Sequence, residues 1–277
     1  MSSAPLRAVI KAVTFDFWGT LLLDSPAADE RYKQQRLSGL AAVLNAMGIR
    51  VGRADLDRAY TASGRELQRR WRAQRDIPVE KAVEAILRSI NPSLPEAIGP
   101  AAVTELVRVY ATPPLAVPPT FDPGAAEALH ELKLRGISLG LVSNTMRTPG
   151  AVLRKILERR GLLDYFSVIT FSDECGIRKP DPEIFRMTLE RIGVAPAEAV
   201  HVGDDPVLDV RGARAAGMRV IQMYVEGYEP PGQRPDGTIR RLDELPGALD
   251  LLERDEAADS DALDTAILFD NRARKSL

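Results

Sequence analysis

Short, uninterrupted apolar segments alternate with helical patterns over the second half of this 277-residue chain. The apolar segments are residues 137–143, 168–170, 200–202 and 219–224, and the helical patterns are residues 124–135, 149–160, 182–192, 207–216 and 242–254. Strands that are apolar throughout are typical of parallel sheets with both faces buried, and the alternating helices provide the cover. We therefore predict an α/β fold with a three-layer α/β/α parallel sheet.

A block of helices interrupts this pattern near the N-terminus. Residues 8–17 predict a buried first strand, whereas strong helix formers recur at helical spacing over residues 27–112. We expect helices there at about residues 28–47, 53–75, 79–90 and 100–111. Five prolines between Pro113 and Pro123 predict a hinge or linker. The predicted domains are a core of residues 1–24 and 114–254, an inserted helical domain of residues 25–113, and a C-terminal tail of residues 255–277.

The composition indicates a globular protein without a strongly charged surface. The net charge of −2 gives no electrostatic reason to expect nucleic acid or an anionic membrane as a partner. The single cysteine, Cys175, excludes an intramolecular disulfide and an all-cysteine zinc site. No apolar run reaches the roughly 18 residues of a membrane span, and residues 1–12 lack a signal-peptide layout. We expect a cytoplasmic monomer or homodimer that binds a small molecule.

Chemically capable side chains follow four of the predicted strands. In a doubly wound sheet the carboxyl ends of the strands meet at one edge, where ligands bind. Each of these residues alone is common in turns and caps, but their combination at one edge indicates a site. They are Asp16 after the first strand, Ser143, Asn144 and Thr145 after the second, Lys179 in the loop after the third, and Asp204 and Asp209 after the fourth.

Three of these residues are carboxylates that the sheet edge would crowd into one pocket. Without a partner, Asp16, Asp204 and Asp209 would repel one another and shift toward protonation. A divalent cation removes that conflict, and a set of oxygen ligands suits Mg²⁺. Asp205 is a further candidate ligand or neighbour of the ion.

The segments that carry these residues resemble the four motifs of the haloacid dehalogenase-like (HAD) hydrolase superfamily, in its subclass with a helical cap (C1). The segments are FDFWGTLL, LVSNT, Gly176–Pro182 and HVGDDPVLD, in the family's order within residues 10–225. The resemblance implies a Rossmann-like core, with the inserted helices as the cap. It also implies a Mg²⁺-dependent hydrolase of a small phosphorylated molecule, and the family is too broad to name the substrate.

The resemblance also implies a role for each residue. Asp16 attacks phosphorus and forms an aspartyl-phosphate that water then cleaves. Lys179 pairs with the phosphate and with Asp16, and Ser143 or Thr145 donates a hydrogen bond to the phosphoryl oxygens. Thr20 orients the nucleophile loop, while Asn144 faces the cap or the substrate. The implied Mg²⁺ ligands are the carboxylates of Asp16, Asp204 and Asp209 and the backbone carbonyl of Trp18.

Trp18 departs from the family pattern, because phosphatases of this family usually carry Asp there as a general acid–base. That catalysis typically contributes about 10²–10⁴ in rate, and an indole cannot supply it. Our first hypothesis is a phosphatase in which Trp18 contacts a substrate that has a good leaving group or its own proton donor. A cap residue could also replace the acid, and the nearby candidates are Asp24, Arg31, Tyr32, Lys33 and Arg36.

Two alternatives remain open. A 2-haloacid dehalogenase that uses Asp16 on a halogenated substrate needs no acid, and that subgroup carries Tyr at the position of Trp18. Those enzymes are metal-free, however, and replace Asp204 with a small polar residue. Their halide-binding Arg corresponds here to Met47, with Arg50 displaced. The other alternative is a non-catalytic module that binds a phosphorylated ligand or a protein.

Overall fold

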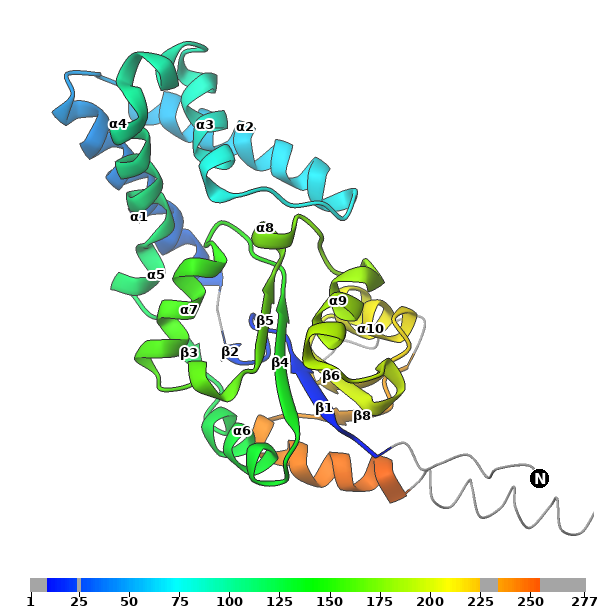
Figure 1. Cartoon of the computed structure of the whole chain (residues 1–277). Helices are drawn as coiled ribbons and strands as arrows, with labels where there is room; N and C mark the ends of the chain where they lie inside the picture. The colour runs from blue at the N-terminus through cyan, green and yellow to red at the C-terminus, as the bar shows by residue number, and fades with distance from the viewer. Residues whose placement is uncertain (1–8, 24–25, 225–233, 255–277) are drawn as a thin grey trace, which may run out of the picture.

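The computed structural model describes residues 9–23, 26–224 and 234–254, whose central feature is a six-stranded parallel sheet (Figure 1). The strands are β1 (Ala12–Phe15), β4 (Ser138–Ser143), β5 (Val168–Phe171), β6 (Ala199–Gly203), β7 (Arg219–Met223) and β8 (Gly237–Ile239). Their order is β5-β4-β1-β6-β7-β8, so β1 pairs with β4 on one side and β6 on the other. The predicted parallel sheet is confirmed, and β8 is an addition to it.

Different helices cover the two faces of the sheet. On one face, Val13 and Phe15 of β1 share an apolar cluster with α6 (Ala125–Leu134), α7 (Gly150–Arg159) and helical residues 245–254. On the other face, Ala12 belongs to a cluster with α9 (Pro182–Ile192) and α10 (Gly212–Ala215). Because alternate residues of a strand point to opposite faces, a strand between two helical layers has to be apolar at every position. The three-layer prediction is therefore confirmed.

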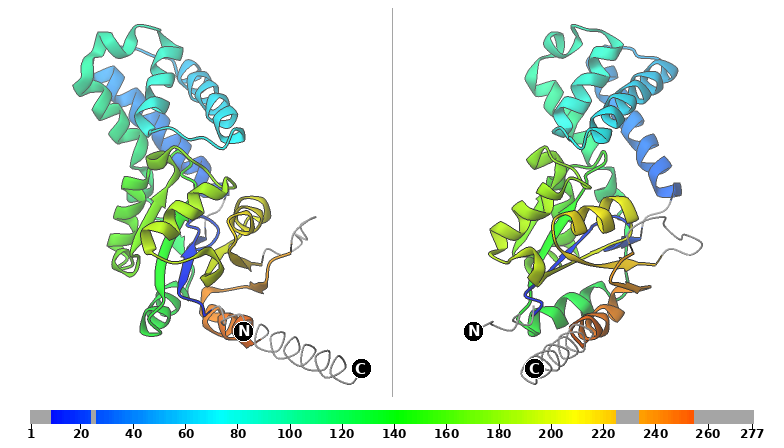
Figure 2. Two further views of the ribbon diagram at one scale, coloured as in Figure 1. Left: turned by 45° about the vertical axis from the view of Figure 1, so that its right-hand side comes forward. Right: turned by 90° about the vertical axis from the view of Figure 1, so that its right-hand side faces the viewer.

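Four helices follow β1 and the short β2 (Leu22–Leu23) and pack around an apolar cluster of their own. They are α1 (Pro26–Ala46), α2 (Arg53–Arg72), α3 (Val79–Ile90) and α4 (Leu94–Ala111), and we call these helices with the loops between them, residues 26–111, the helical block. Both views in Figure 2 show the block at one end of the sheet-centred core. The predicted start of the last helix at residue 100 reflects a kink, because Gly99 has φ +78° immediately before Pro100 inside α4.

Short elements complete the chain. The proline-rich segment predicted as a linker contains α5 (Pro113–Ala116) and β3 (Thr120–Phe121), and β3 pairs antiparallel with β2. The remaining elements are α8 (Ser172–Cys175), η1 (Leu163–Tyr165), η2 (Pro196–Glu198), η3 (Pro206–Arg211) and η4 (Leu242–Glu244). None of the helices in the described ranges combines the length and the apolarity that a bilayer crossing requires. The tail predicted at residues 255–277 lies outside the described residues.

Candidate functional site

The carboxyl ends of β1 and β6 bring three carboxylates together, as the sequence predicts. Asp16 follows β1 directly, while Asp204 follows β6 and Asp209 lies in η3. One carboxylate oxygen from each of the three lies within 4.8 Å of the others. Asp16 and Asp204 line a cavity of about 560 Å³.

Lys179 lies between two of these carboxylates. Its Nζ is 2.8 Å from Oδ1 of Asp16 and 2.6 Å from Oδ1 of Asp209, and its side chain is only 1% exposed. Burial acts to lower the pKa of Lys179, but the charges of Asp16 and Asp209 outweigh it and raise that pKa. Burial raises the pKa of Asp16, against the opposing effect of Lys179. The lysine therefore stays charged and holds Asp16 at the base of the cavity.

Asp209 is fully buried, and both of its oxygens accept hydrogen bonds. Oδ1 receives Lys179 Nζ and faces Nε2 of His201 at 3.0 Å, while Oδ2 accepts from the amide of Asp205 at 3.0 Å. Burial acts to raise the pKa of Asp209, but Lys179 and His201 together hold it below its ordinary value. His201 also contacts Thr14 Oγ1 through Nδ1 at 2.9 Å. Both ring nitrogens of this core histidine therefore have a hydrogen-bond partner, and one of the two partners, Asp209, is a residue of the site.

Asp204 contrasts with Asp209, because no described residue donates a hydrogen bond to its carboxylate. Burial, followed by the charges of Asp16 and Asp209, raises the pKa of Asp204 to about 7. Gly19 has φ +75°, and a Cβ at that position would overlap the Asp204 carboxylate, so glycine is needed there for two reasons. A half-buried carboxylate that lies beside two buried ones and has no donor fits a cation site, because oxygen ligands of this kind suit a divalent cation.

Asp205 lines the cavity and also caps a helix. Its Oδ1 accepts from the amides of Val207 at 2.7 Å and Leu208 at 2.9 Å, so it caps the first turn of η3. The capping residue of this helical turn is therefore Asp205, which leaves Asp204 free of that task.

The three polar residues at the end of β4 and directly after it have different surroundings. Ser143 is fully buried at the end of β4 and does not line the cavity, and its Oγ has no hydrogen-bond partner within the described ranges. Asn144 lines the cavity, but its side chain holds the backbone of Lys179: its Nδ2 donates to the carbonyl at 3.0 Å, and its Oδ1 accepts from the amide at 2.9 Å. Thr145 Oγ1 donates to Asp76 of the helical block at 3.3 Å.

Two residues of the nucleophile loop carry polar atoms that are buried without a partner among the described residues. They are Thr20, through Oγ1, and Trp18, through Nε1. The Trp18 ring lies 5.6 Å from that of Phe17 in an edge-on arrangement, and Trp18 lines the cavity. Such orphaned groups are uncommon in protein interiors, and two of those in the described residues lie in this one loop.

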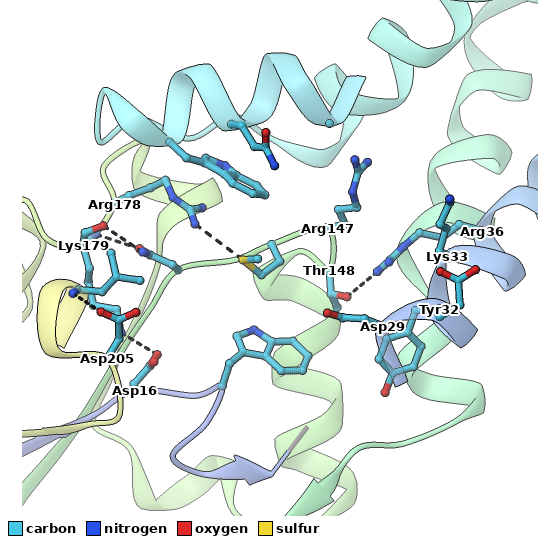
Figure 3. A pocket seen from close by; sticks show the side chains of 18 of the residues that line it. Asp16, Asp29, Tyr32, Lys33, Arg36, Arg147, Thr148, Arg178, Lys179 and Asp205 are labelled. Carbon is cyan, nitrogen blue, oxygen red and sulfur yellow. Dashed lines mark hydrogen bonds and ion pairs between the residues drawn. The ribbon is translucent and has the colours of Figure 1, made fainter. Parts of the chain in front are cut away.

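The cavity extends from Asp16 to the helical block (Figure 3). The figure shows Asp16 and Lys179 toward one end and Tyr32, Lys33 and Arg36 toward the other. Of the residues considered as substitutes for the missing acid, these last three line the cavity, Arg31 does not, and Asp24 lies outside the described residues. Met47 and Arg50 do not line it either.

Two arginines of the cavity share one anchor that sequence reasoning missed. Arg36 donates through Nε to the Tyr110 carbonyl at 3.1 Å and through Nη2 to Thr148 Oγ1 at 2.9 Å. Arg147 donates through Nη1 to the Tyr110 hydroxyl at 2.6 Å and stacks on Tyr60 at 3.9 Å from the ring centre. No described carboxylate forms an ion pair with either arginine. The position of Arg147 two residues after the LVSNT segment was the only sequence signal for it.

Comparisons with known proteins identify the family to which the chain is similar. A family model described as haloacid dehalogenase-like hydrolase matches residues 10–217. A phosphoglycolate phosphatase from Rhodospirillum rubrum is 32% identical over 221 residues, which cover 79% of this chain and 82% of that protein. A phosphoserine phosphatase from Thermus thermophilus is 42% identical over 125 residues, which cover 44% of this chain and 49% of that protein, so the chain spans about half the length of that relative.

A solved structure adds a relative with a different activity in its name. The crystal structure of a 2-haloacid dehalogenase from Pseudomonas syringae pv. Tomato matches with a TM-score of 0.65 and 26% identity. The match covers 87% of this chain and 99% of that chain. The overall fold is therefore common to proteins named for two chemistries, and the side chains of the site have to distinguish them.

Proposed function

The chain belongs to the haloacid dehalogenase-like hydrolase family, and from that premise we propose that it is a Mg²⁺-dependent phosphatase of a small phosphorylated metabolite. The observation that carries the proposal is the Asp204 carboxylate, which is half-buried beside the buried Asp16 and Asp209 and accepts no hydrogen bond from any described residue. A dehalogenase of the metal-free kind has no use for a third carboxylate there, because it adds only repulsion. The proposed role of residues 25–113 is that of a helical cap, and the cytoplasmic location remains a prediction.

The proposed Mg²⁺ ligands are Asp16, Asp204 and the backbone carbonyl of Trp18. Asp209 is proposed as a ligand through Oδ2, which accepts one hydrogen bond and retains acceptor capacity. When bound, Mg²⁺ would neutralise charge between the carboxylates and the phosphoryl oxygens.

The proposed reaction has two steps. An oxygen of Asp16 forms a bond to phosphorus while the bond from phosphorus to the leaving oxygen breaks, and the leaving oxygen takes the electron pair. Water then attacks the aspartyl-phosphate, which releases inorganic phosphate and restores the carboxylate. Lys179 stabilises the negative charge on the phosphoryl oxygens. The orphaned hydroxyl of Ser143 is outside the lining of the cavity, and it is proposed to donate to a phosphoryl oxygen once phosphate is bound.

The leaving group follows from Trp18. The indole cannot donate a proton to the leaving oxygen. Tyr32, Lys33 and Arg36 lie toward the other end of the cavity from Asp16 in Figure 3, and so does the carboxylate of Asp29. We therefore propose substrates whose leaving group departs without an acid, such as acyl phosphates and aryl phosphates. We also propose a second anionic group on the substrate, because Arg36 is only 5% exposed and has no carboxylate partner among the described residues.

A second candidate is hydrolysis of a 2-haloacid with Asp16 as nucleophile. Trp18 favours it, because an aromatic residue at this position suits a leaving group that needs no proton. Asp204 opposes it, and so do Met47 and Arg50, which lie away from the cavity where a halide-binding cation is required.

A substrate screen with and without Mg²⁺ tests these proposals. Acetyl phosphate, p-nitrophenyl phosphate, alkyl phosphates with and without a distal carboxylate, and 2-chloropropionate form the set. We expect chelator-sensitive phosphate release that is fastest with the first two, and among alkyl esters faster with the carboxylate. Chloride release that is insensitive to chelator would establish the dehalogenase, and no release of either product would leave a non-catalytic binding module.

A further inference from the structure

The loop between α2 and α3 is bound to the loop that carries Lys179. The amide of Asp76 donates to the carbonyl of Gly176 at 3.0 Å, and the amide of Arg178 donates to the carbonyl of Gln74 at 3.1 Å. Between these two bonds, Arg75 and Ile177 form an antiparallel bridge. The helical block is thus joined to the core by backbone pairing at the residue immediately before Lys179. We call this contact, residues 74–76 with 176–178, the clasp.

The carboxylate of Asp76 joins three separate segments of the core. Its Oδ2 accepts from a guanidinium nitrogen of Arg178, from Ser172 Oγ at 2.6 Å and from Thr145 Oγ1 at 3.3 Å. Its Oδ1 accepts from Trp71 Nε1 at 3.2 Å, and the Arg178 guanidinium lies 4.4 Å from the centre of that ring. The same Arg178 nitrogen also donates to the backbone carbonyl of Thr145 at 2.6 Å.

The ion pair at the clasp is buried. The side chains of Arg178 and Asp76 are 5% and 3% exposed. Burial lowers the pKa of Arg178, and the charge of Asp76 opposes this effect. Within the described ranges, Asp76 is the only carboxylate in an ion pair with Arg178, so the core relies on the helical block to compensate this cation. A buried charge that loses its partner is strongly unfavourable, which ties Arg178 to Asp76.

Two backbone positions of the site depend on this pair. Arg178 precedes Lys179, whose Nζ holds Asp16, and it binds the carbonyl of Thr145 directly after Asn144. Asn144 in turn binds the amide and the carbonyl of Lys179. We propose that Asp76 is a positioning residue, which holds Arg178 and thereby sets where Lys179 and Asn144 stand relative to the nucleophile. The inference rests on the proposed phosphatase function for its kinetic consequences, but the geometry it invokes is independent of activity.

Steady-state kinetics with p-nitrophenyl phosphate and Mg²⁺ tests the kinetic consequence. We expect Asp76→Asn to lower kcat by between about tenfold and about a hundredfold, because small misplacements of a site residue have effects of that size. Asp76→Glu should restore part of the loss. In an Arg178→Met background Asp76→Asn should cause no further loss, because Asp76 acts through Arg178.

The matched control is Arg75→Gln, which removes an exposed ion pair with Asp181 from the same clasp and should leave kcat within about twofold. An unchanged kcat in Asp76→Asn, or losses that multiply in the double variant, would overturn the proposal.

Hydrogen exchange tests the geometry without reference to turnover. In Asp76→Asn we expect faster exchange of the backbone amides of residues 172–181, while Arg75→Gln resembles the wild type over the same segment. If Asp76→Asn does not fold, the Asp76→Asn/Arg178→Met double variant, which contains no buried unpaired charge, replaces it. A wild type without phosphatase activity but with this exchange pattern would reject the proposed function and retain the clasp. Unchanged exchange over residues 172–181 would reject the positioning role itself.

Discussion

Arg178 and Lys179 are adjacent cations that are buried against different parts of the molecule. Lys179 is held by Asp16 and Asp209, which follow strands of the same sheet. Arg178 is held by Asp76, which comes from the helical block. The first cluster is complete as soon as the sheet forms, because the carboxyl ends of parallel strands meet at one edge. The second cluster exists only when the helical block lies on the core. The environment of Lys179 therefore depends on the fold of the core alone, whereas that of Arg178 depends on packing between the core and the helical block.

The two clusters should differ most in their contribution to catalysis, and Asp16→Asn measures the contribution of the cluster around Lys179. We expect turnover of acetyl phosphate or p-nitrophenyl phosphate to fall by more than about 10³-fold, because an amide cannot act as the nucleophile. The thermal midpoint should change little, since burial already raises the pKa of Asp16 and a neutral side chain fits the site. Phosphate release and thermal unfolding are measured on the same preparation. Turnover at the wild-type level in Asp16→Asn would assign the nucleophile to another residue.

The two clusters should differ less in their contribution to the free energy of unfolding. Lys179→Met leaves Asp16 and Asp209 in the interior without their cation, and we expect a loss of about 3–5 kcal/mol in the free energy of unfolding. Asp76→Asn should cost less, because the Arg178 guanidinium retains the Thr145 carbonyl and the Trp71 ring and can become hydrated if the helical block separates from the core. Urea unfolding at pH 7 measures both. If Asp76→Asn proved the more harmful of the two, the clasp and not the sheet edge would be the stronger element.

The sequence was sufficient for the sheet edge because its residues follow apolar strands in chain order. The continuous apolar strand of residues 137–143 and the alternation around it predicted the layers. Asp16, Asn144 and Asp204 lie where strands end, and Lys179 lies in the loop after β5 and α8. Asp76 follows a helix rich in arginine and has no periodic pattern around it, so nothing in the sequence indicated which core residue it would reach. Its position depends on packing between the helical block and the core, which local patterns do not specify.

The Arg36 and Arg147 pair escaped prediction for the same physical reason. Arg36 lies on α1, Arg147 lies after β4, and their common anchor Tyr110 lies on α4, so three elements have to pack before the two arginines share one cavity. The choice between Asp204 and Asp205 is a different case. Both follow β6, and the structure separates them only because the η3 amides are near enough to Asp205 for capping.

Mg²⁺ and pH should change the free energy of unfolding by a few kcal/mol through the carboxylates at the sheet edge, and the clasp should not contribute to this change. The pKa of Asp204 rises from 3.8 to about 7 in the folded protein. Between these values the folded state keeps a proton that the unfolded state has lost, so this group stabilises the fold at low pH and the contribution is lost as pH rises through about 7. Asp204→Asn should remove that part of the pH dependence of unfolding.

Mg²⁺ should replace the proton on Asp204 once the pH exceeds about 7. The stabilisation by Mg²⁺, about 2.7 kcal/mol at a concentration a hundredfold above its Kd, should therefore be larger at pH 8 than at pH 6. Differential scanning calorimetry with and without Mg²⁺ at the two pH values measures this. Asp76→Asn serves as the control and should show the wild-type response, since the clasp holds no candidate ligand. A Mg²⁺ response that survives Asp204→Asn would remove Asp204 from the proposed ligand set.

The smallest effect should come from the exposed part of the clasp. Arg75 is 57% exposed and lies 3.1 Å from Asp181, so solvent screens this ion pair. We expect Arg75→Gln to lower the free energy of unfolding by at most about 1 kcal/mol, with the difference disappearing in high salt. The Arg178–Asp76 pair, one position away on each strand of the same bridge, should lose much more on removal of its carboxylate and should not respond to salt. Equal losses in the free energy of unfolding of Arg75→Gln and Asp76→Asn would mean that burial does not set the strength of the clasp. Arg178 and Lys179 would then differ only in their contribution to catalysis.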